Sequence, residues 1–252
     1  MEISRAGKRT KGMPAPTPTP TRAPEEIVAA YHQIEVSQHP FFVELGKGPV
    51  DLGSVYLLMA NLQVGISPNF VPWLARTIER VEDRRIGSLL AKQLDDELGR
   101  GDFSQIHTRL LDTFVAALEP WRPKGSDEVL LGAGRRLAAD GSRPFHAADP
   151  YEGVGALIVG EIFAEKMDAR LATEMRRQHE VQGQALYWLD LHEKLEVDHS
   201  DDSSELARLV PPEGPRLEAT WRGAADQWTA LWRFLDDVQA LAAGRERRVG
   251  TA

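Results

Sequence analysis

The chain has 252 residues, of which 42% are hydrophobic, and a formal net charge of −8 at pH 7. Its length allows one large domain or two small ones with a sizeable core. Its acidity argues against nucleic acid or an anionic membrane surface as the main partner, and the absence of cysteine excludes disulfides, thiolate metal sites and cysteine nucleophiles. No apolar run approaches the roughly 20 residues of a membrane span, and no apolar segment follows the basic N-terminus as in a secretory signal. We therefore expect a cytoplasmic protein.

Three regions follow from composition. Residues 1–23 are basic and then alternate proline with threonine, a pattern that favours polyproline II and offers no apolar face, so we predict a disordered tail. Residues 24–243 carry no linker and no internal repeat, which indicates a single domain. Residues 244–252 are predicted to be a frayed end.

The domain is predicted to be all-α because apolar residues recur at helical spacing and no segment alternates with period two for long. The expected helical segments are 25–45 (bent at Pro40), 51–66, 67–81, 83–101, 102–118, 126–141, 150–178, 181–199, 203–210 and 216–244. Asp51, Ser67 and Ser126 are the expected N-caps. We expect about eight helices, in a bundle less regular than a short four-helix bundle.

One stretch of the helix predicted at 181–199 has a pattern typical of metal ligands. His192, Glu196 and His199 are spaced by four and three residues, so on a helix they lie within roughly 60° of one another. Two imidazoles and a carboxylate suit iron, manganese or zinc. A polar stripe on a solvated helix is the plainer interpretation, but neighbouring Trp188 and Leu189 indicate partial burial, and buried groups of this kind need a partner.

Two other stretches can complete such a site. Glu97 ends one helical run and His107 lies in the next, and the glycines at 99 and 101 between them allow both side chains to face one centre. Taken alone, Glu97 fits a surface acid better, and an inward His107 fits a hydrogen-bonded core residue better. Glu161 follows an apolar run in which a solvated carboxylate is hard to explain. Three carboxylates and three imidazoles would nearly neutralise two divalent cations.

These six residues carry a resemblance to a known family. The chain resembles the heme-oxygenase-like diiron oxidases, whose fold is shared with heme oxygenase, thiaminase II and pyrroloquinoline-quinone synthase. The resemblance covers approximately residues 25–240 and rests on the D-E-L-G-R-G segment at 96–101 and on the early H-P-F-F segment at 39–42. It also rests on six candidate ligands in order: Glu97, His107, Glu161, His192, Glu196 and His199. Glu196 stands where the family more often has aspartate.

The resemblance implies a non-heme diiron oxidase or oxygenase that uses Fe(II) and O2, with two irons of which the second is labile. It implies oxidation of a small amine, amino acid or fatty-acid-like substrate by N-oxygenation, desaturation or carbon–carbon cleavage, often in natural-product biosynthesis. Phe163, Tyr187 and Trp188 are adjacent to the ligands and are the expected substrate contacts. Glu79 and Glu82 are candidates for a further carboxylate ligand. The apolar last helix suits a dimer interface or a core face equally, so a homodimer stays open.

Four alternatives compete with a diiron oxidase. A ferritin-like site needs a second Glu-x2-His motif, which the chain lacks. Heme oxygenase chemistry needs one proximal histidine, which His32 or His39 could supply, but it leaves the six ligands unexplained. A cofactor-free enzyme of the thiaminase II or quinone-synthase type keeps the fold without needing all six. A non-enzymatic helical binding module has no need for Glu161 in an apolar run.

Overall fold

The computed structural model describes residues 23–249, and it describes their side chains except at 184, 193–201 and 245–249. Within these residues the chain is helical and contains no strand, which confirms the all-α prediction. The α-helices are α1 Glu25–His32, α2 Pro40–Leu45, α3 Leu52–Gly65, α4 Phe70–Arg80, α5 Arg84–Glu97, α6 His107–Leu118, α7 Asp127–Leu130, α8 Gly132–Gly141, α9 Arg143–His146, α10 Tyr151–Met175, α11 Tyr187–Leu209 and α12 Pro215–Val249. Short 3₁₀ turns are η1 Val36–Gln38, η2 Phe103–Gln105, η3 Glu119–Trp121 and η4 Gly183–Leu186.

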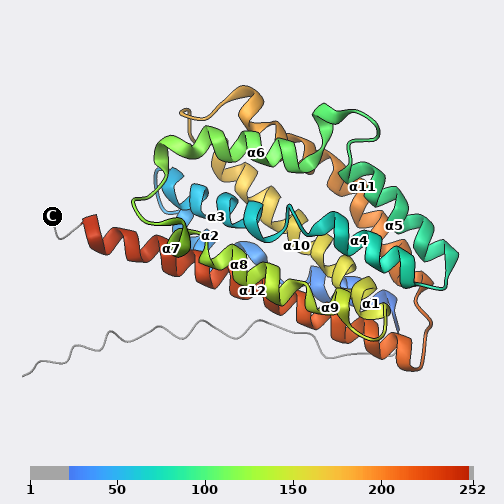
Figure 1. Cartoon of the computed structure of the whole chain (residues 1–252). Helices are drawn as coiled ribbons and strands as arrows, with labels where there is room; N and C mark the ends of the chain where they lie inside the picture. The colour runs from blue at the N-terminus through green and yellow to red at the C-terminus, as the bar shows by residue number, and fades with distance from the viewer. Residues whose placement is uncertain (1–22, 250–252) are drawn as a thin grey trace, which may run out of the picture.

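Helix α10 runs through the middle of the bundle (Figure 1). It packs against α12 along one side and α11 along another, and it also contacts α1, α4 and α9. Its sequence explains this position, since buried residues occur all around the helix from Tyr151 to Phe163, whereas a surface helix has one apolar stripe. The side chain of Glu161 thus projects from the helix that the others surround.

The contact between α10 and α12 depends on small residues. A β-carbon added at Gly155 would collide with the carbonyl oxygen of Thr220, and one added at Gly223 would collide with the carbonyl oxygen of Glu152. Two glycines therefore let the two backbones approach more closely than side chains would permit. The tryptophans at 221, 228 and 232 and Phe234 of α12 are buried in the core.

The structure agrees with the predicted N-caps at only some of the three positions. Asp51 caps α3 by accepting a hydrogen bond from the Gly53 N–H at 3.2 Å, as expected. Ser67 does not begin a helix, because residues 66–69 form a turn and α4 begins at Phe70. Ser126 precedes α7, but its side chain makes no capping hydrogen bond.

The last two long helices are longer than predicted. Residues 203–210 were expected to form a separate short helix, but they are the end of α11, which continues unbroken from Tyr187 to Leu209. Residues 200–204 include three serines but no proline or glycine, so nothing interrupts the backbone hydrogen bonds of the helix there. The α12 backbone continues to Val249, past the helix end predicted at 244. The tail predicted at 1–23 lies, except for its last residue, outside the described residues.

Candidate metal centre and its cavity

The turn between α5 and α6 positions the first two candidate ligands. Gly99, Arg100 and Gly101 all adopt positive φ, at 80°, 50° and 85°. A side chain at Gly99 has no room, because a β-carbon there would collide with the Asp102 carbonyl oxygen and lie 2.9 Å from the Gln105 carbonyl carbon. The left-handed turn reverses the chain within a few residues. It therefore brings the end of α5 back beside the start of α6.

Glu97 and His107 meet across this turn. His107 Nδ1 lies 3.0 Å from Glu97 Oε1, and the side chains are only 7% and 13% exposed, respectively. The carboxylate accepts, so the imidazole donates through Nδ1. Glu97 is thus mostly buried and not a surface acid, and His107 is turned inward as predicted.

Glu161 reaches the same region from α10. Its Oε1 accepts a short hydrogen bond from Gln93 Nε2, and Gln93 lies one helical turn before Glu97 on α5. Gln93 therefore helps to orient the Glu161 carboxylate, and it is not among the residues predicted from the sequence. The spacing of four residues from Glu97 is the signal that could have identified it.

His192 comes from the start of α11. Its Nδ1 lies 2.7 Å from the backbone oxygen of Trp188, which can only accept, so Nδ1 carries the proton and the ring lone pair is on Nε2. Its ring lies 5.0 Å from that of His107 and 4.0 Å from that of Trp188, measured between centroids. A carbonyl that fixes the tautomer in this way is common behind metal-binding histidines.

Glu196 and His199 lie on the same continuous helix as His192, but their side chains are outside the described part. Among the side chains that are described, no three His, Asp or Glu residues are grouped closely enough to hold a metal ion. The described part of the predicted site is therefore a Glu97–His107 pair with His192 beside it and Glu161 on the facing helix.

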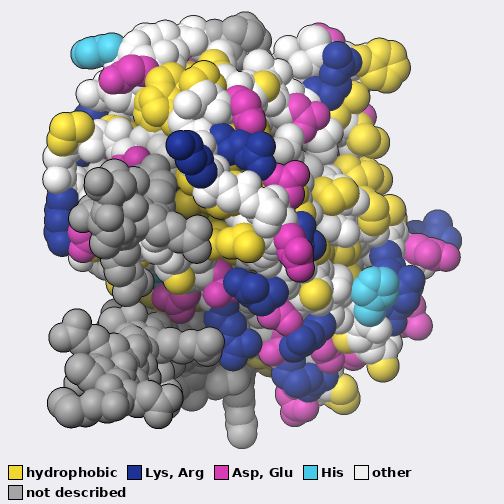
Figure 2. Space-filling model, turned by 60° about the vertical axis from the view of Figure 1, so that its left-hand side comes forward, with side chains coloured by type: hydrophobic (Ala, Val, Ile, Leu, Met, Phe, Trp, Pro, Cys, Tyr) yellow, Lys and Arg dark blue, Asp and Glu magenta, His cyan; other side chains and the backbone are white. Residues whose placement is uncertain are grey.

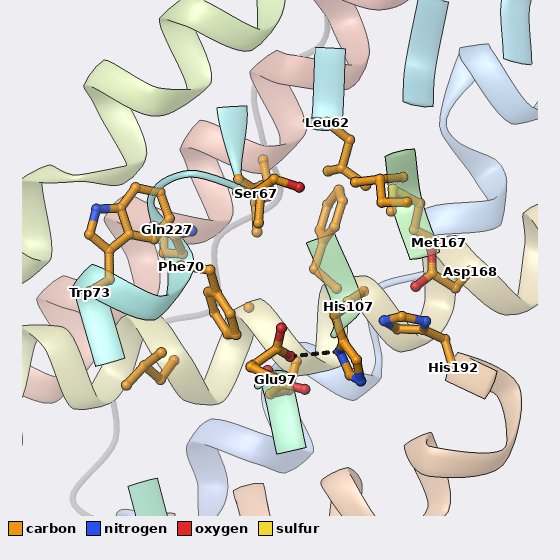
Figure 3. A pocket seen from close by; sticks show the side chains of 18 of the residues that line it. Leu62, Ser67, Phe70, Trp73, Glu97, His107, Met167, Asp168, His192 and Gln227 are labelled. Atoms are coloured by element: carbon orange, nitrogen blue, oxygen red, sulfur yellow. Dashed lines mark hydrogen bonds and ion pairs between the residues drawn. The ribbon is translucent and has the colours of Figure 1, made fainter. Parts of the chain in front are cut away.

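These four residues line one cavity of about 130 Å3. The cavity is mostly apolar, with walls from Phe70, Leu111, Leu157 and Met167, among others. Figure 3 shows Glu97, His107 and His192 gathered at one side of it. An apolar cavity with a few converging polar groups is the usual form of a small-molecule site.

The predicted substrate contacts divide into two groups. Phe163 and Trp188 line the cavity. Tyr187 does not line it, because its hydroxyl is turned toward the α5–α6 connection and donates to Gln105 Oε1 at 2.8 Å. Glu79 is exposed, and Glu82 is ion-paired at the surface with Arg216, so neither candidate for a further ligand lines the cavity.

Two buried polar residues of the cavity were not anticipated. Asp168 is 2% exposed and lies seven residues after Glu161 on α10, so helical periodicity could have identified it. Gln227 is 4% exposed and lies on α12, where its tryptophan-rich surroundings predict only core. Figure 3 shows Asp168 close to His192, whereas Gln227 lies beside Trp73 on the other side of the cavity.

The sequence profile of a family described as iron-containing redox enzymes matches residues 63–233, which span every candidate ligand. The chain belongs to this family of iron-containing redox enzymes. The match confirms the family suspected from the ligand pattern and identifies iron as the metal associated with the family.

A solved structure shares the fold. The chain is similar to a domain of unknown function with a heme oxygenase-like fold from Shewanella denitrificans OS217, with 16% identity and a TM-score of 0.63 over 87% of this chain and 91% of that chain. At this identity the likeness shows the fold alone, and it confirms the heme-oxygenase-like bundle. No curated protein matches the chain.

Two further observations concern the charge of the surface and the apolarity of the helices. Figure 2 shows acidic and basic side chains mixed over the face that it presents. In the part of the chain that the structure describes, no helix combines the length and apolarity that a membrane crossing requires.

Proposed function

We propose that this iron-containing redox enzyme is a non-heme diiron oxidase that uses O2 to oxidise a small organic substrate. The observation that carries the proposal is the convergence of Glu97, His107, Glu161 and His192 on one buried cavity from four different helices. Carboxylates and imidazoles without thiolates are the donor set that non-heme iron takes. Glu196 and His199, one and two turns beyond His192 on α11, complete the proposed ligand set.

The chain's own residues orient these donors. The Trp188 carbonyl holds the His192 proton on Nδ1, so Nε2 is the nitrogen that would bind iron. Gln93 donates to one oxygen of the Glu161 carboxylate and so helps to orient it. The Glu97–His107 pair lies within hydrogen-bond distance, so both ligands would address the same ion after a small adjustment.

When bound, the two Fe(II) ions supply electrons that reduce O2 to a species able to oxidise the substrate. The cavity supplies the remaining requirements. Its apolar walls, including Phe163 and Trp188, exclude water from the reacting atoms and hold the substrate beside the ligands. Among the side chains that the structure describes, neither lysine nor arginine lines the cavity, so these residues would leave an anionic group on the substrate to be neutralised at the iron end. A small amine, amino acid or fatty-acid-like molecule fits these conditions.

The first test is metal stoichiometry. We expect the protein to take up about two Fe(II) ions per chain under anaerobic conditions and to develop a transient visible absorbance when O2 is admitted. His192→Ala and Glu161→Ala should lose iron binding while keeping the helical circular dichroism signal, because each removes a ligand from an otherwise packed bundle. Glu196→Asp should keep more iron than Glu196→Ala, since aspartate retains the carboxylate.

The results would separate this function from the alternatives. Iron affinity of wild-type strength in His192→Ala or Glu161→Ala would exclude those residues as ligands. A protein that takes up no iron even without O2 would instead favour a cofactor-free enzyme of the same fold or a helical binding module.

A further inference from the structure

Packing explains two of the three glycines of helix α10. A β-carbon at Gly155 would collide with the Thr220 carbonyl oxygen, and one at Gly153 would lie 2.7 Å from Thr77 Oγ1. At Gly160 a β-carbon would meet nothing within 4 Å among the residues that the structure describes. Glycine inside a helix is less stable than alanine, because it loses more backbone freedom on folding. Contacts with described residues therefore give no reason for a glycine at this position.

Gly160 faces the cavity. The α10 residues that line the cavity span an arc of roughly 160° around the helix, and Gly160 lies within about 20° of the middle of that arc. Residues 153–159 of α10 are buried, whereas Gly160 is partly accessible, as are Glu161 and Ala164, which line the same cavity. A ligand in the cavity can therefore touch the backbone of Gly160.

The backbone of Gly160 offers such a ligand its α-carbon. Gly160 lies in the interior of α10, where N–H and C=O groups are paired with each other along the helix. A group in contact with Gly160 therefore gains van der Waals contact and no hydrogen bond, which suits a methylene group. The next residue is Glu161, a proposed iron ligand that lines the same cavity, so a methylene held here lies close to the proposed reaction centre.

We propose that Gly160 is a specificity-determining residue whose missing side chain leaves room for a methylene segment of the substrate beside Glu161. This inference rests on the proposed function, which places the oxidation of the substrate in this cavity. A larger residue at position 160 would suit the helix better but would occupy the space that the substrate chain needs. The glycine thus gives up stability in exchange for substrate room.

The test compares ligands of increasing chain length. Straight-chain primary amines and straight-chain carboxylic acids are titrated into the full chain by isothermal titration calorimetry, with the protein both metal-free and loaded anaerobically with Fe(II). The affinity of wild-type protein should rise about fourfold with each added methylene until the cavity is filled. In Gly160→Ala the rise should end at a shorter chain, and in Gly160→Leu it should end at a still shorter one.

Thermal unfolding separates substrate room from helix stability. Gly160→Ala should raise the thermal midpoint by about 1–4 °C. Gly160→Leu should not lower it, because the cavity offers about 130 Å3 for the new side chain.

Gly87→Ala on α5 is the matched control. A β-carbon at Gly87 would make only an ordinary contact, 3.9 Å from Val81 Cγ2, and Gly87 does not line the cavity. This variant should raise the thermal midpoint to a similar extent and leave the chain-length limit unchanged.

The proposal is overturned if neither ligand series binds wild-type protein or if Gly160→Leu keeps the wild-type chain-length limit. It is also overturned if Gly160→Leu unfolds at a lower temperature than wild type, which would show that protein atoms fill the space. Loss of iron binding in Gly160→Ala would have the same consequence, because the glycine would then serve the metal ligands.

The iron count distinguishes this failure from failure of the proposed function. Iron uptake by wild type and variants with an unchanged chain-length limit rejects the role of Gly160 and keeps the diiron assignment. A chain-length limit that shortens in the Gly160 variants of a protein that takes up no iron supports the role of Gly160 and rejects diiron chemistry.

Discussion

His39 begins helix α2 with its own side chain. Its Nδ1 accepts a hydrogen bond from the Phe41 N–H at 3.2 Å, so the proton is on Nε2, which lies 3.2 Å from Asp236 Oδ1 of α12. The ring is completely buried against Trp232. Burial lowers the pKa of His39 to about 4, and protonation of Nδ1 would place two N–H groups against each other. His39 is therefore a neutral structural residue, which also explains its place in the H-P-F-F segment.

This geometry predicts a pH dependence of stability. The unfolded chain binds a proton at His39 near pH 6.5 and the folded chain only near pH 4, so the unfolded state binds more protons between these values. The contribution is fully present above about 6.5 and is lost as the pH falls toward about 4, by at most about 3 kcal/mol. Urea unfolding across this range should show it.

His39→Asn is the matched variant, because asparagine keeps a capping oxygen but does not titrate. Burial raises the pKa of Asp236, so its contribution to the pH dependence has the opposite sign to that of His39. An equally steep loss of stability in wild type and variant would contradict the assignment.

The α5–α6 turn shows how one element depends on a few backbone angles. Glu97 and His107 are ten residues apart in sequence and hydrogen-bonded in the structure only because Gly99, Arg100 and Gly101 adopt left-handed conformations. A β-carbon at Gly99 would also collide with backbone atoms of the turn, whereas a β-carbon at Gly101 would meet nothing within 4 Å. The two glycines thus allow a comparison between backbone strain and steric collision.

We expect Gly99→Ala to lower the free energy of unfolding by about 2 kcal/mol or more and to weaken Fe(II) binding, because the turn must open to admit the methyl group. Gly101→Ala should cost only about 1–2 kcal/mol from its positive φ and leave Fe(II) binding unchanged. Chemical unfolding and anaerobic iron titration measure both effects. Equal iron affinity in the two variants would mean that the turn does not position the ligands.

At the scale of the whole molecule, the bundle is assembled around α10, which supplies both the deepest core and the Glu161 carboxylate. Its close contact with α12 through Gly155 brings Gln227 and Phe234 of α12 into the cavity wall. The same contact that stabilises the fold therefore also closes the site.

Gly155→Ala should consequently destabilise the protein by about 3 kcal/mol or more, since the added methyl collides with the Thr220 carbonyl oxygen and the helices must separate. Gly160→Ala on the same helix meets nothing within 4 Å and should raise stability by about 0.5–1 kcal/mol through helix propensity. Thermal unfolding of both variants tests this. A tolerated Gly155→Ala would show that the α10–α12 contact is not tightly packed.

Helical spacing alone places the candidate ligands His192, Glu196 and His199 on one stripe, and the glycines between Glu97 and His107 predict a turn. The family was predicted from the resemblance that these residues carry. The boundaries that failed, at Ser67 and at the serines after His199, failed because capping residues also occur inside turns and helices. Tyr187 lies five residues before His192 on the same helix. Its orientation depends on a hydrogen bond to Gln105, which the local sequence pattern does not predict.

The sequence by itself determined the helical class and the spacing of the candidate ligands, because both depend on periodicity along the chain, and the resemblance of its motifs to a known family indicated the heme-oxygenase-like fold. Only the tertiary structure decided which side chains share the cavity. It brought Gln93 to Glu161, placed Asp168 beside His192, and set the amide of Gln227 opposite them. The physical reason is that contacts between helices depend on how closely their backbones approach, which is fixed by packing around Gly155 and Gly223 and not by any pattern within one helix.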